Sequence, residues 1–137
     1  MRTWLLNSLM ALCCFGLWAF LPKVAVKYIS PKSALVYEVL GGMLVGFVVL
    51  LSLDKRLEAN IKGIIPALLT GIVGYIGFLF FLYAVQAGKV SIVASLTAVY
   101  PLVAVILAMI FLGEKIHVLQ YIGIVFALVS VVLLSYR

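Results

Sequence analysis

Glu38 is the residue in this sequence whose type and place most directly suggest chemistry. It is the one charged side chain in an apolar run that reaches from Ser33 to Leu53. Such a carboxylate can take up a proton, bind a cationic ligand, or pair with a neighbouring base. Which of these roles is open to it depends on the solvent that surrounds the chain.

The composition identifies that solvent. Hydrophobic residues make up 67% of the sequence and charged residues 10%, and the mean hydropathy is +1.35. A soluble domain carries roughly 25% charged residues, so water would not wet most of this surface. Apolar runs of about 20 residues, the length needed to cross a bilayer, recur along the chain. The sequence therefore predicts a multi-pass integral membrane protein embedded in the lipid bilayer.

The predicted fold is all-α, with five transmembrane helices in one domain over residues 1–137. The expected helices cover residues 4–28, 33–53, 64–87, 90–112 and 118–136. The sequence between them carries glycine, proline and charge, which end helices or stay at the water interface. A cleaved signal peptide is the alternative for residues 1–25. That run is too long for a signal sequence and contains two tryptophans, so we predict a retained span.

Lys23 is the base that we expect at the depth of Glu38. Counted from the predicted turn at residues 29–31, Glu38 is about eight residues along the second helix, or about 12 Å. Lys23 is about seven residues before the turn on the first helix, or about 10 Å. An ion pair between them would lower the cost of placing an acid in hydrocarbon, which is about 2.5–3.5 kcal/mol at a helix centre. The alternative is a proton or substrate site at Glu38, to which Lys23 contributes.

Aromatic side chains and a proline mark further candidates for a binding site. An organic cation is attracted to the face of an aromatic ring, so a cage is one interpretation, and packing is the other. The aromatic candidates are Trp18, Tyr37, Tyr75 and Tyr100. Pro101 lacks the N–H that would bond the carbonyl of Thr97, and this predicts a broken helix beside a midplane site that includes Thr97. A simple packing kink at Pro101 is the alternative.

Small residues predict close contacts between helices. Spacings of the GxxxG type let helix backbones approach one another, and glycines also thin a helix where substrate needs room. The predicted packing residues are Gly42, Gly46, Gly71, Gly74, Gly123 and Ala127.

Enzyme chemistry has no support in the sequence, and we expect no catalytic residue, metal or cofactor. The chain has one histidine, His117, and its two cysteines, Cys13 and Cys14, are adjacent within an apolar span. No phosphate-binding loop or nucleophile motif is present. The formal charge of +6 comes from lysines and arginines beside the spans, which we expect to meet lipid headgroups rather than nucleic acid.

Residues 84–134 contain the turn at Gly88-Lys89, the mid-helix Pro101, the turn at 112–115, and Gly123. With these features they resemble the C-terminal half of an EamA domain of the drug/metabolite transporter superfamily. The first span matches more loosely, through Trp18 and the lysine after it. The resemblance implies a transporter of small metabolites or drugs, built from two five-helix units of opposite orientation. The resemblance assigns no role to Glu38.

The distribution of positive charge bears on the second five-helix unit. With the N-terminus in the cytoplasm, the cytoplasmic side would hold Arg2, Lys55, Arg56, Lys62 and Lys115. The opposite side would hold Lys27, Lys32, Lys89 and Arg137, with Lys23 nearby. Lysine and arginine bias sets orientation, and here the two sides are nearly balanced. We therefore predict that the chain inserts both ways and forms an antiparallel homodimer; a separate partner chain is the alternative.

These observations together predict a secondary transporter, an exporter of small molecules, in the bacterial cytoplasmic (inner) membrane. Its substrate path would lie between two copies, with proton coupling through Glu38 as one option. Two alternatives remain open. One is a subunit of a heteromeric transporter or of a flippase for a lipid-linked substrate, and the other is a non-transporting membrane assembly protein.

Overall fold

The computed structural model describes residues 3–53, 57–114 and 117–135. In these ranges the chain is helical apart from short connections, and no strand is present. The chain forms two compact units, which are described separately: the first ends at Ala87 and the second begins at Gly88. Five basic residues used in the charge comparison lie outside the described residues, namely Arg2, Lys55, Arg56, Lys115 and Arg137.

The first unit consists of three helices. They are α1 (Thr3–Ala25), α2 (Pro31–Ser52) and α3 (Ile61–Ala87). The start of α2 follows from its local sequence. Ser30 is the N-cap, and its side-chain oxygen accepts a hydrogen bond from the backbone N–H of Ser33 at 3.3 Å. Pro31 follows at the first helical position, where its fixed φ suits a helix and its missing N–H leaves no donor unsatisfied.

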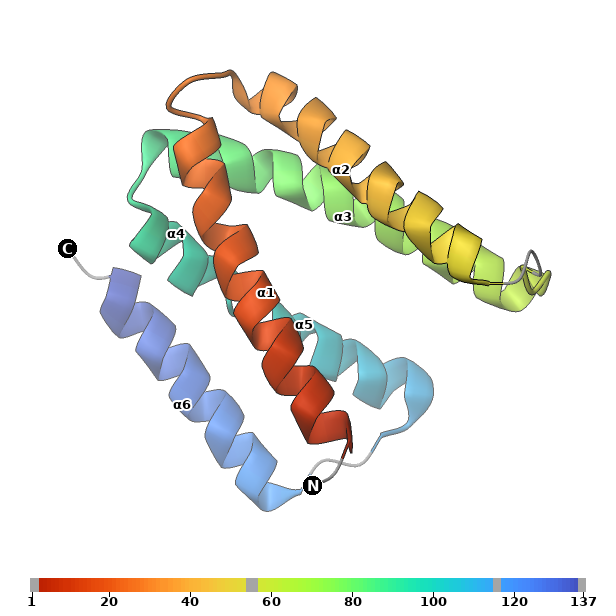
Figure 1. Ribbon diagram of the computed structural model, residues 1–137. Coiled ribbons are helices and arrows are strands. Elements are labelled where there is room, and N and C mark those ends of the chain that lie inside the picture. Colours follow the sequence, from red (N-terminus) through yellow and green to blue (C-terminus); the bar gives the residue numbers. More distant parts are fainter. Residues whose placement is uncertain (1–2, 54–56, 115–116, 136–137) are drawn as a thin grey trace. The chain divides into compact units, whose positions relative to one another are not determined.

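Helix α3 packs against both α1 and α2, which diverge from the turn that joins them (Figure 1). Its buried residues are Phe78, Phe81, Leu82 and Val85. They recur at the three- and four-residue spacing of one helix face. Pro22 near the end of α1 and Ala34 near the start of α2 are also buried. The packed part of this unit therefore combines the C-terminal half of α3 with the ends of α1 and α2 that lie next to their connection.

The second unit contains a broken helix and a final helix. Its elements are α4 (Val90–Thr97), α5 (Tyr100–Leu107), the π-helical turn η1 (Ala108–Leu112) and α6 (Val118–Ser135). Pro101 cannot donate the bond that would continue α4, and the N–H of Leu102 instead bonds the carbonyl of Val99 at 2.8 Å. Helix α4 ends at Thr97 and α5 begins at Tyr100, and Ala98 and Val99 between them keep right-handed helical φ and ψ, so the predicted interruption is present as a kink. Gly113 ends η1 with a φ of 64°, a left-handed conformation that glycine adopts without strain.

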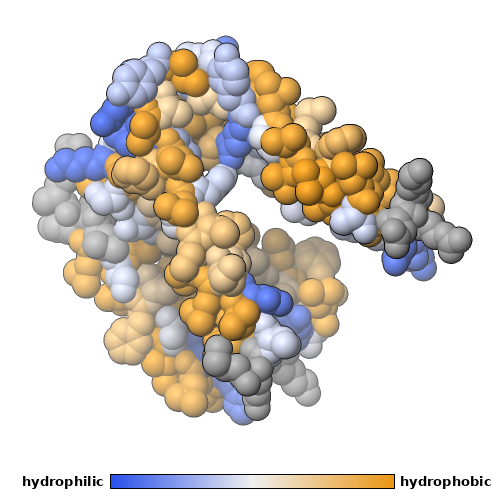
Figure 2. Space-filling view, viewed as in Figure 1, coloured by the Kyte–Doolittle hydropathy of each residue, from blue (hydrophilic) through white to orange (hydrophobic). Residues whose placement is uncertain are grey.

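Apolar side chains face outward along the helices, as expected of a chain whose solvent is lipid. Figure 2 shows hydrophobic residues over the visible face of α2. The segments long and apolar enough to cross a membrane are Thr3–Ala25, Pro31–Ser52, Ile61–Ala87 and Val90–Leu112, and a shorter apolar stretch is Val118–Leu133. The predicted all-α fold with about five apolar helices is confirmed, and the observed ends lie within about three residues of the predicted ones. The chain is a multi-pass integral membrane protein.

Candidate functional site

Trp18 and Glu38 meet between α1 and α2. The indole Nε1–H of Trp18 donates a hydrogen bond to Glu38 Oε1 at 2.5 Å. The second carboxylate oxygen, Oε2, is buried and has no hydrogen-bond partner. A buried acceptor without a donor is costly and uncommon in proteins. The Glu38 carboxylate is therefore held through one oxygen and lacks a donor at the other.

Lys23 does not form the ion pair with Glu38 that their matching depths predicted. Its Nζ donates to the backbone carbonyl of Val85 at 2.6 Å, in the last turn of α3. The last carbonyls of a helix lack intrahelical donors, and a cation is favourable beside them. The prediction assumed that α1 and α2 run side by side, whereas they diverge and both pack on α3. Lys23 thus ties α1 to α3, and a role in substrate binding stays a prediction.

An aromatic cluster that the sequence analysis missed contacts Trp18. The ring centroid of Trp18 lies 4.8 Å from that of Phe78 and 5.8 Å from that of Phe81. Both phenylalanines are buried on α3. Close ring pairs stabilise packing beyond the area that they bury, so this cluster fixes the position of the indole. A signal was available in the sequence, because Phe78 and Phe81 share the helix face of Leu82 and Val85.

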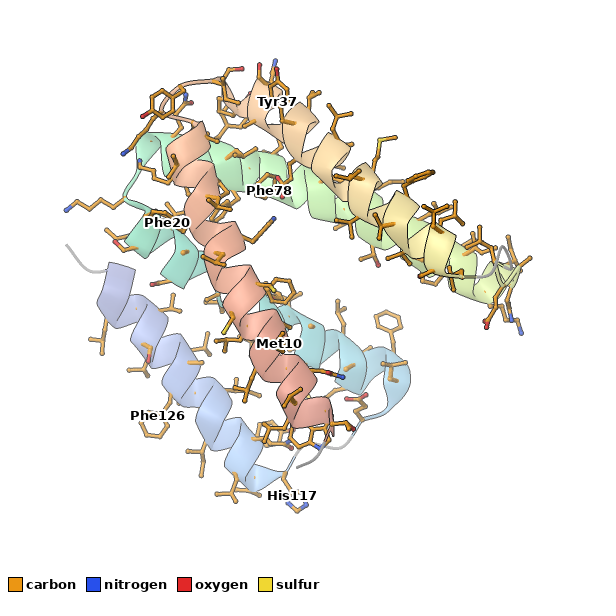
Figure 3. The ribbon with its side chains drawn as sticks, viewed as in Figure 1. Met10, Phe20, Tyr37, Phe78, His117 and Phe126 are labelled. Carbon is orange, nitrogen blue, oxygen red and sulfur yellow. The ribbon has the colours of Figure 1, made fainter. Side chains whose placement is uncertain are left out.

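A cavity of about 260 Å³ lies between the three helices of the first unit. Its lining includes Trp18 and Pro22 from α1, Tyr37 and Glu38 from α2, and Phe78 and Leu82 from α3. Tyr37 and Phe78 are labelled in Figure 3. Small-molecule sites are usually concave and apolar, with a few polar groups that orient the ligand. The cavity has that form, with Glu38 as its ionisable group.

Tyr75 contacts α2 at Gly42, about one helical turn before Phe78 on α3. A Cβ added to Gly42 would lie 2.5 Å from Tyr75 Oη, so the glycine leaves room for the hydroxyl. At the other four predicted packing glycines, Gly46, Gly71, Gly74 and Gly123, such a Cβ would meet nothing within 4 Å. Packing roles at those four glycines stay predictions, as does the role of Tyr75 in substrate binding.

The remaining predicted binding residues lie at the helix break of the second unit. The hydroxyl of Thr97 donates back to the carbonyls of its own helix, at 2.9 Å to Val93 and 3.1 Å to Ala94. Tyr100 is exposed at the start of α5. The Thr97 hydroxyl is therefore engaged within α4, and substrate binding by Thr97, Tyr100 and Pro101 stays a prediction.

A groove of about 680 Å³ lies between α5 and α6. Small residues line both of its sides, among them Ala104 and Ala108 on one and Gly123 and Ala127 on the other. Pro101 also lines it. Pro101 and the predicted packing residues Gly123 and Ala127 therefore line the same groove, and packing roles for Gly123 and Ala127 stay predictions. Small residues on facing helices leave space in which a further helix can pack closely.

Comparison with known proteins adds three findings. The model of the EamA-like transporter family matches residues 2–136, which include every helix described above. A protein of the archaeon Methanocaldococcus jannaschii, itself described as uncharacterized, is 27% identical over 135 residues. That alignment covers 98% of this chain and 98% of the archaeal protein. No solved structure matches the chain.

Proposed function

This chain belongs to the EamA-like transporter family, and on that premise we propose that it is a secondary transporter whose substrate binds in the cavity beside Glu38. The observation that carries the proposal is a carboxylate in an apolar cavity with one oxygen lacking a donor. Ionisable groups within membrane spans commonly mark substrate and proton pathways. The family resemblance predicted from the sequence is confirmed by the family match.

Glu38 is the group through which transport is coupled to protons in this proposal. A carboxylate can be charged or neutral, and intramembrane acids serve as proton relays in pumps and transporters. Trp18 keeps Oε1 in place through its N–H, which supports a fixed position for the carboxylate. Exchange of a proton at Glu38 during each cycle would link substrate movement to a pH gradient.

Transport by the purified protein tests this function. The protein is reconstituted in liposomes with an imposed pH gradient and offered a panel of labelled small metabolites and drugs. We expect pH-driven movement of at least one compound, and its loss in Glu38→Gln, which removes the charge at nearly constant shape. Glu58→Gln is the matched control, because Glu58 is exposed in the connection between α2 and α3. Wild-type rates in Glu38→Gln, or no movement of any compound, would contradict the proposal.

Two copies of opposite orientation form the complete transporter in this proposal. The balance of lysine and arginine between the two sides supports insertion in both orientations. The groove lined by Pro101, Gly123 and Ala127 supports a further helix contact in the second unit. Export from the cytoplasm, across the bacterial cytoplasmic membrane, completes the proposal.

Labelling of one cysteine tests the dimer. A cysteine replaces Tyr28, which is exposed in the connection between α1 and α2 and carries no charge, so the lysine and arginine balance is kept; the background lacks Cys13 and Cys14. Labelling from both sides of the membrane, with crosslinks between opposed copies, is the expected result. Labelling from one side only would exclude dual insertion and favour a distinct partner chain.

A further inference from the structure

The polar groups of the Glu38 cavity restrict what can bind there. Glu38 Oε1 accepts the Trp18 N–H, and Oε2 accepts nothing. In its charged form the Glu38 carboxylate only accepts hydrogen bonds, so the group that completes this form of the site is a donor. In a low-dielectric cavity, a donor that carries positive charge binds a carboxylate more strongly than a neutral donor does. These two requirements point to an ammonium group.

Access to Oε2 needs only a local movement. The atom is buried in the structure, while Glu38 as a residue is partly exposed. The terminal torsion of a glutamate side chain is broad, so the carboxylate can turn slightly without a change of backbone. A small turn that keeps the bond from Trp18 to Oε1 would bring Oε2 toward the cavity that Glu38 lines.

The walls of the cavity determine the rest of the ligand. Trp18, Tyr37 and Phe78 supply aromatic surface, and Pro22 and Leu82 are among the aliphatic residues. Aromatic faces attract cations and also pack well against an apolar group. The volume of about 260 Å³ lies below the usual range for drug-sized ligands, about 300–1,000 Å³, so a small molecule fits best.

A second charge on the ligand would find no partner in this cavity. No lysine or arginine is among the described residues that line it, and Lys23 Nζ is bonded to the carbonyl of Val85. The carboxylate of an amino acid would therefore find no counter-charge on the walls of the cavity, and beside Glu38 it would meet a like charge, which is unfavourable. A monoamine satisfies the site, whereas a zwitterion or an anion does not.

We propose that the Glu38 cavity binds a small protonated monoamine, with the ammonium at Glu38 and the apolar part against Trp18 and Phe78. This substrate class rests on the transport function proposed above. The ammonium donates to the Glu38 carboxylate and supplies the donor that Oε2 lacks. The aromatic cluster holds the indole so that its N–H keeps the carboxylate facing the ligand.

Four probes that share a phenyl ring and differ in the polar group test the proposal. They are 2-phenylethylamine, 2-phenylethanol, phenylalanine and 3-phenylpropionate, which are a cation, a neutral alcohol, a zwitterion and an anion. The chain has two tryptophans, Trp4 and Trp18. The substitution Trp4→Phe leaves Trp18 as the remaining tryptophan, so the tryptophan fluorescence of this variant reports on the cavity. Saturable quenching by 2-phenylethylamine, and not by the other three, is the expected result. This comparison needs no change at Glu38, so it does not depend on the folding of a Glu38 variant.

Charge removal in the same Trp4→Phe background completes the test. Glu38→Gln should weaken 2-phenylethylamine binding by roughly tenfold to a hundredfold, the range for loss of a hydrogen bond to a charged group. Glu58→Gln should bind like the parent protein. Equal binding of the alcohol and the amine, tighter binding of the zwitterion or anion, or undiminished binding by Glu38→Gln would overturn the proposal. If the amine does not bind while Glu38-dependent transport of another compound is observed, the substrate class is wrong and the proposed function stands.

Discussion

The two units of this chain differ in how their helices are held. In the first unit, Leu82 and Val85 are fully buried, and Trp18 and Lys23 make specific polar contacts between helices. In the second unit, none of the described residues is buried, and a wide groove separates α5 from α6. Lipid does not penalise exposed apolar surface, so packing between membrane helices depends on shape and on hydrogen bonds. The first unit provides both within itself. The second has a weaker bond between helical elements, from Tyr121 Oη to Met109 Sδ at 3.6 Å, and leaves more surface for other elements to cover.

The largest expected effect is the loss of a packed side chain from the first unit. Leu82, which is 1% exposed, is compared with Leu107 on α5, which is 48% exposed. Leu82→Ala should lower the free energy of unfolding by roughly 2 kcal/mol, at the low end for such substitutions because lipid adds no transfer term. Leu107→Ala should change it by less than about 0.5 kcal/mol. Unfolding of the purified protein in mixed micelles with rising SDS measures the free energy of unfolding of both variants. Equal losses would mean that Leu82 and Leu107 are packed to the same extent in the assembled protein.

The next effect concerns the polar contacts of the first unit. Lys23→Met should lower the free energy of unfolding by about 1.5 kcal/mol, because the carbonyl of Val85 loses a charged donor. Since Lys23 and Glu38 have different partners, the losses from Lys23→Met and Glu38→Leu should add to within about 0.5 kcal/mol in the double variant. The same SDS titration measures this cycle. A double variant as stable as the wild-type protein would instead indicate an ion pair between Lys23 and Glu38, contrary to the contacts in the structure.

The smallest effect tests the contact between α2 and α3. Gly42→Ala should be about 1 kcal/mol less stable than Gly41→Ala, since the new Cβ meets Tyr75 Oη, while a Cβ at Gly41 meets nothing. The difference is modest because the hydroxyl is the end of a side chain that can turn. Tyr75→Phe removes the oxygen and should abolish the difference between the two alanine variants. Thermal unfolding in one detergent measures all four proteins, and a difference that persists in Tyr75→Phe would show that the clash is elsewhere.

Part of the candidate site could be predicted from the sequence. Glu38 was identified because an acid in an apolar run is conspicuous whatever lies around it. Trp18 was identified only as one of several aromatic residues, and its bond to Glu38 was not predicted. Phe78 and Phe81 were missed, although their spacing on one helix face indicates a buried position. The reason is that most side chains of a membrane helix are apolar, so those facing protein and those facing lipid differ little in type.

The sequence by itself determined where the helices lie and where one of them breaks. Apolar runs long enough to cross a bilayer define the spans, and proline and glycine act on their immediate neighbours, so Pro101 and Gly113 have local effects that need no tertiary contact. Only the tertiary structure decided that Glu38 meets Trp18 while Lys23 reaches Val85. Counting residues from a turn gives the depth of a side chain, whereas its partner also depends on the angle between helices. Here that angle follows from the packing of both α1 and α2 on the buried face of α3.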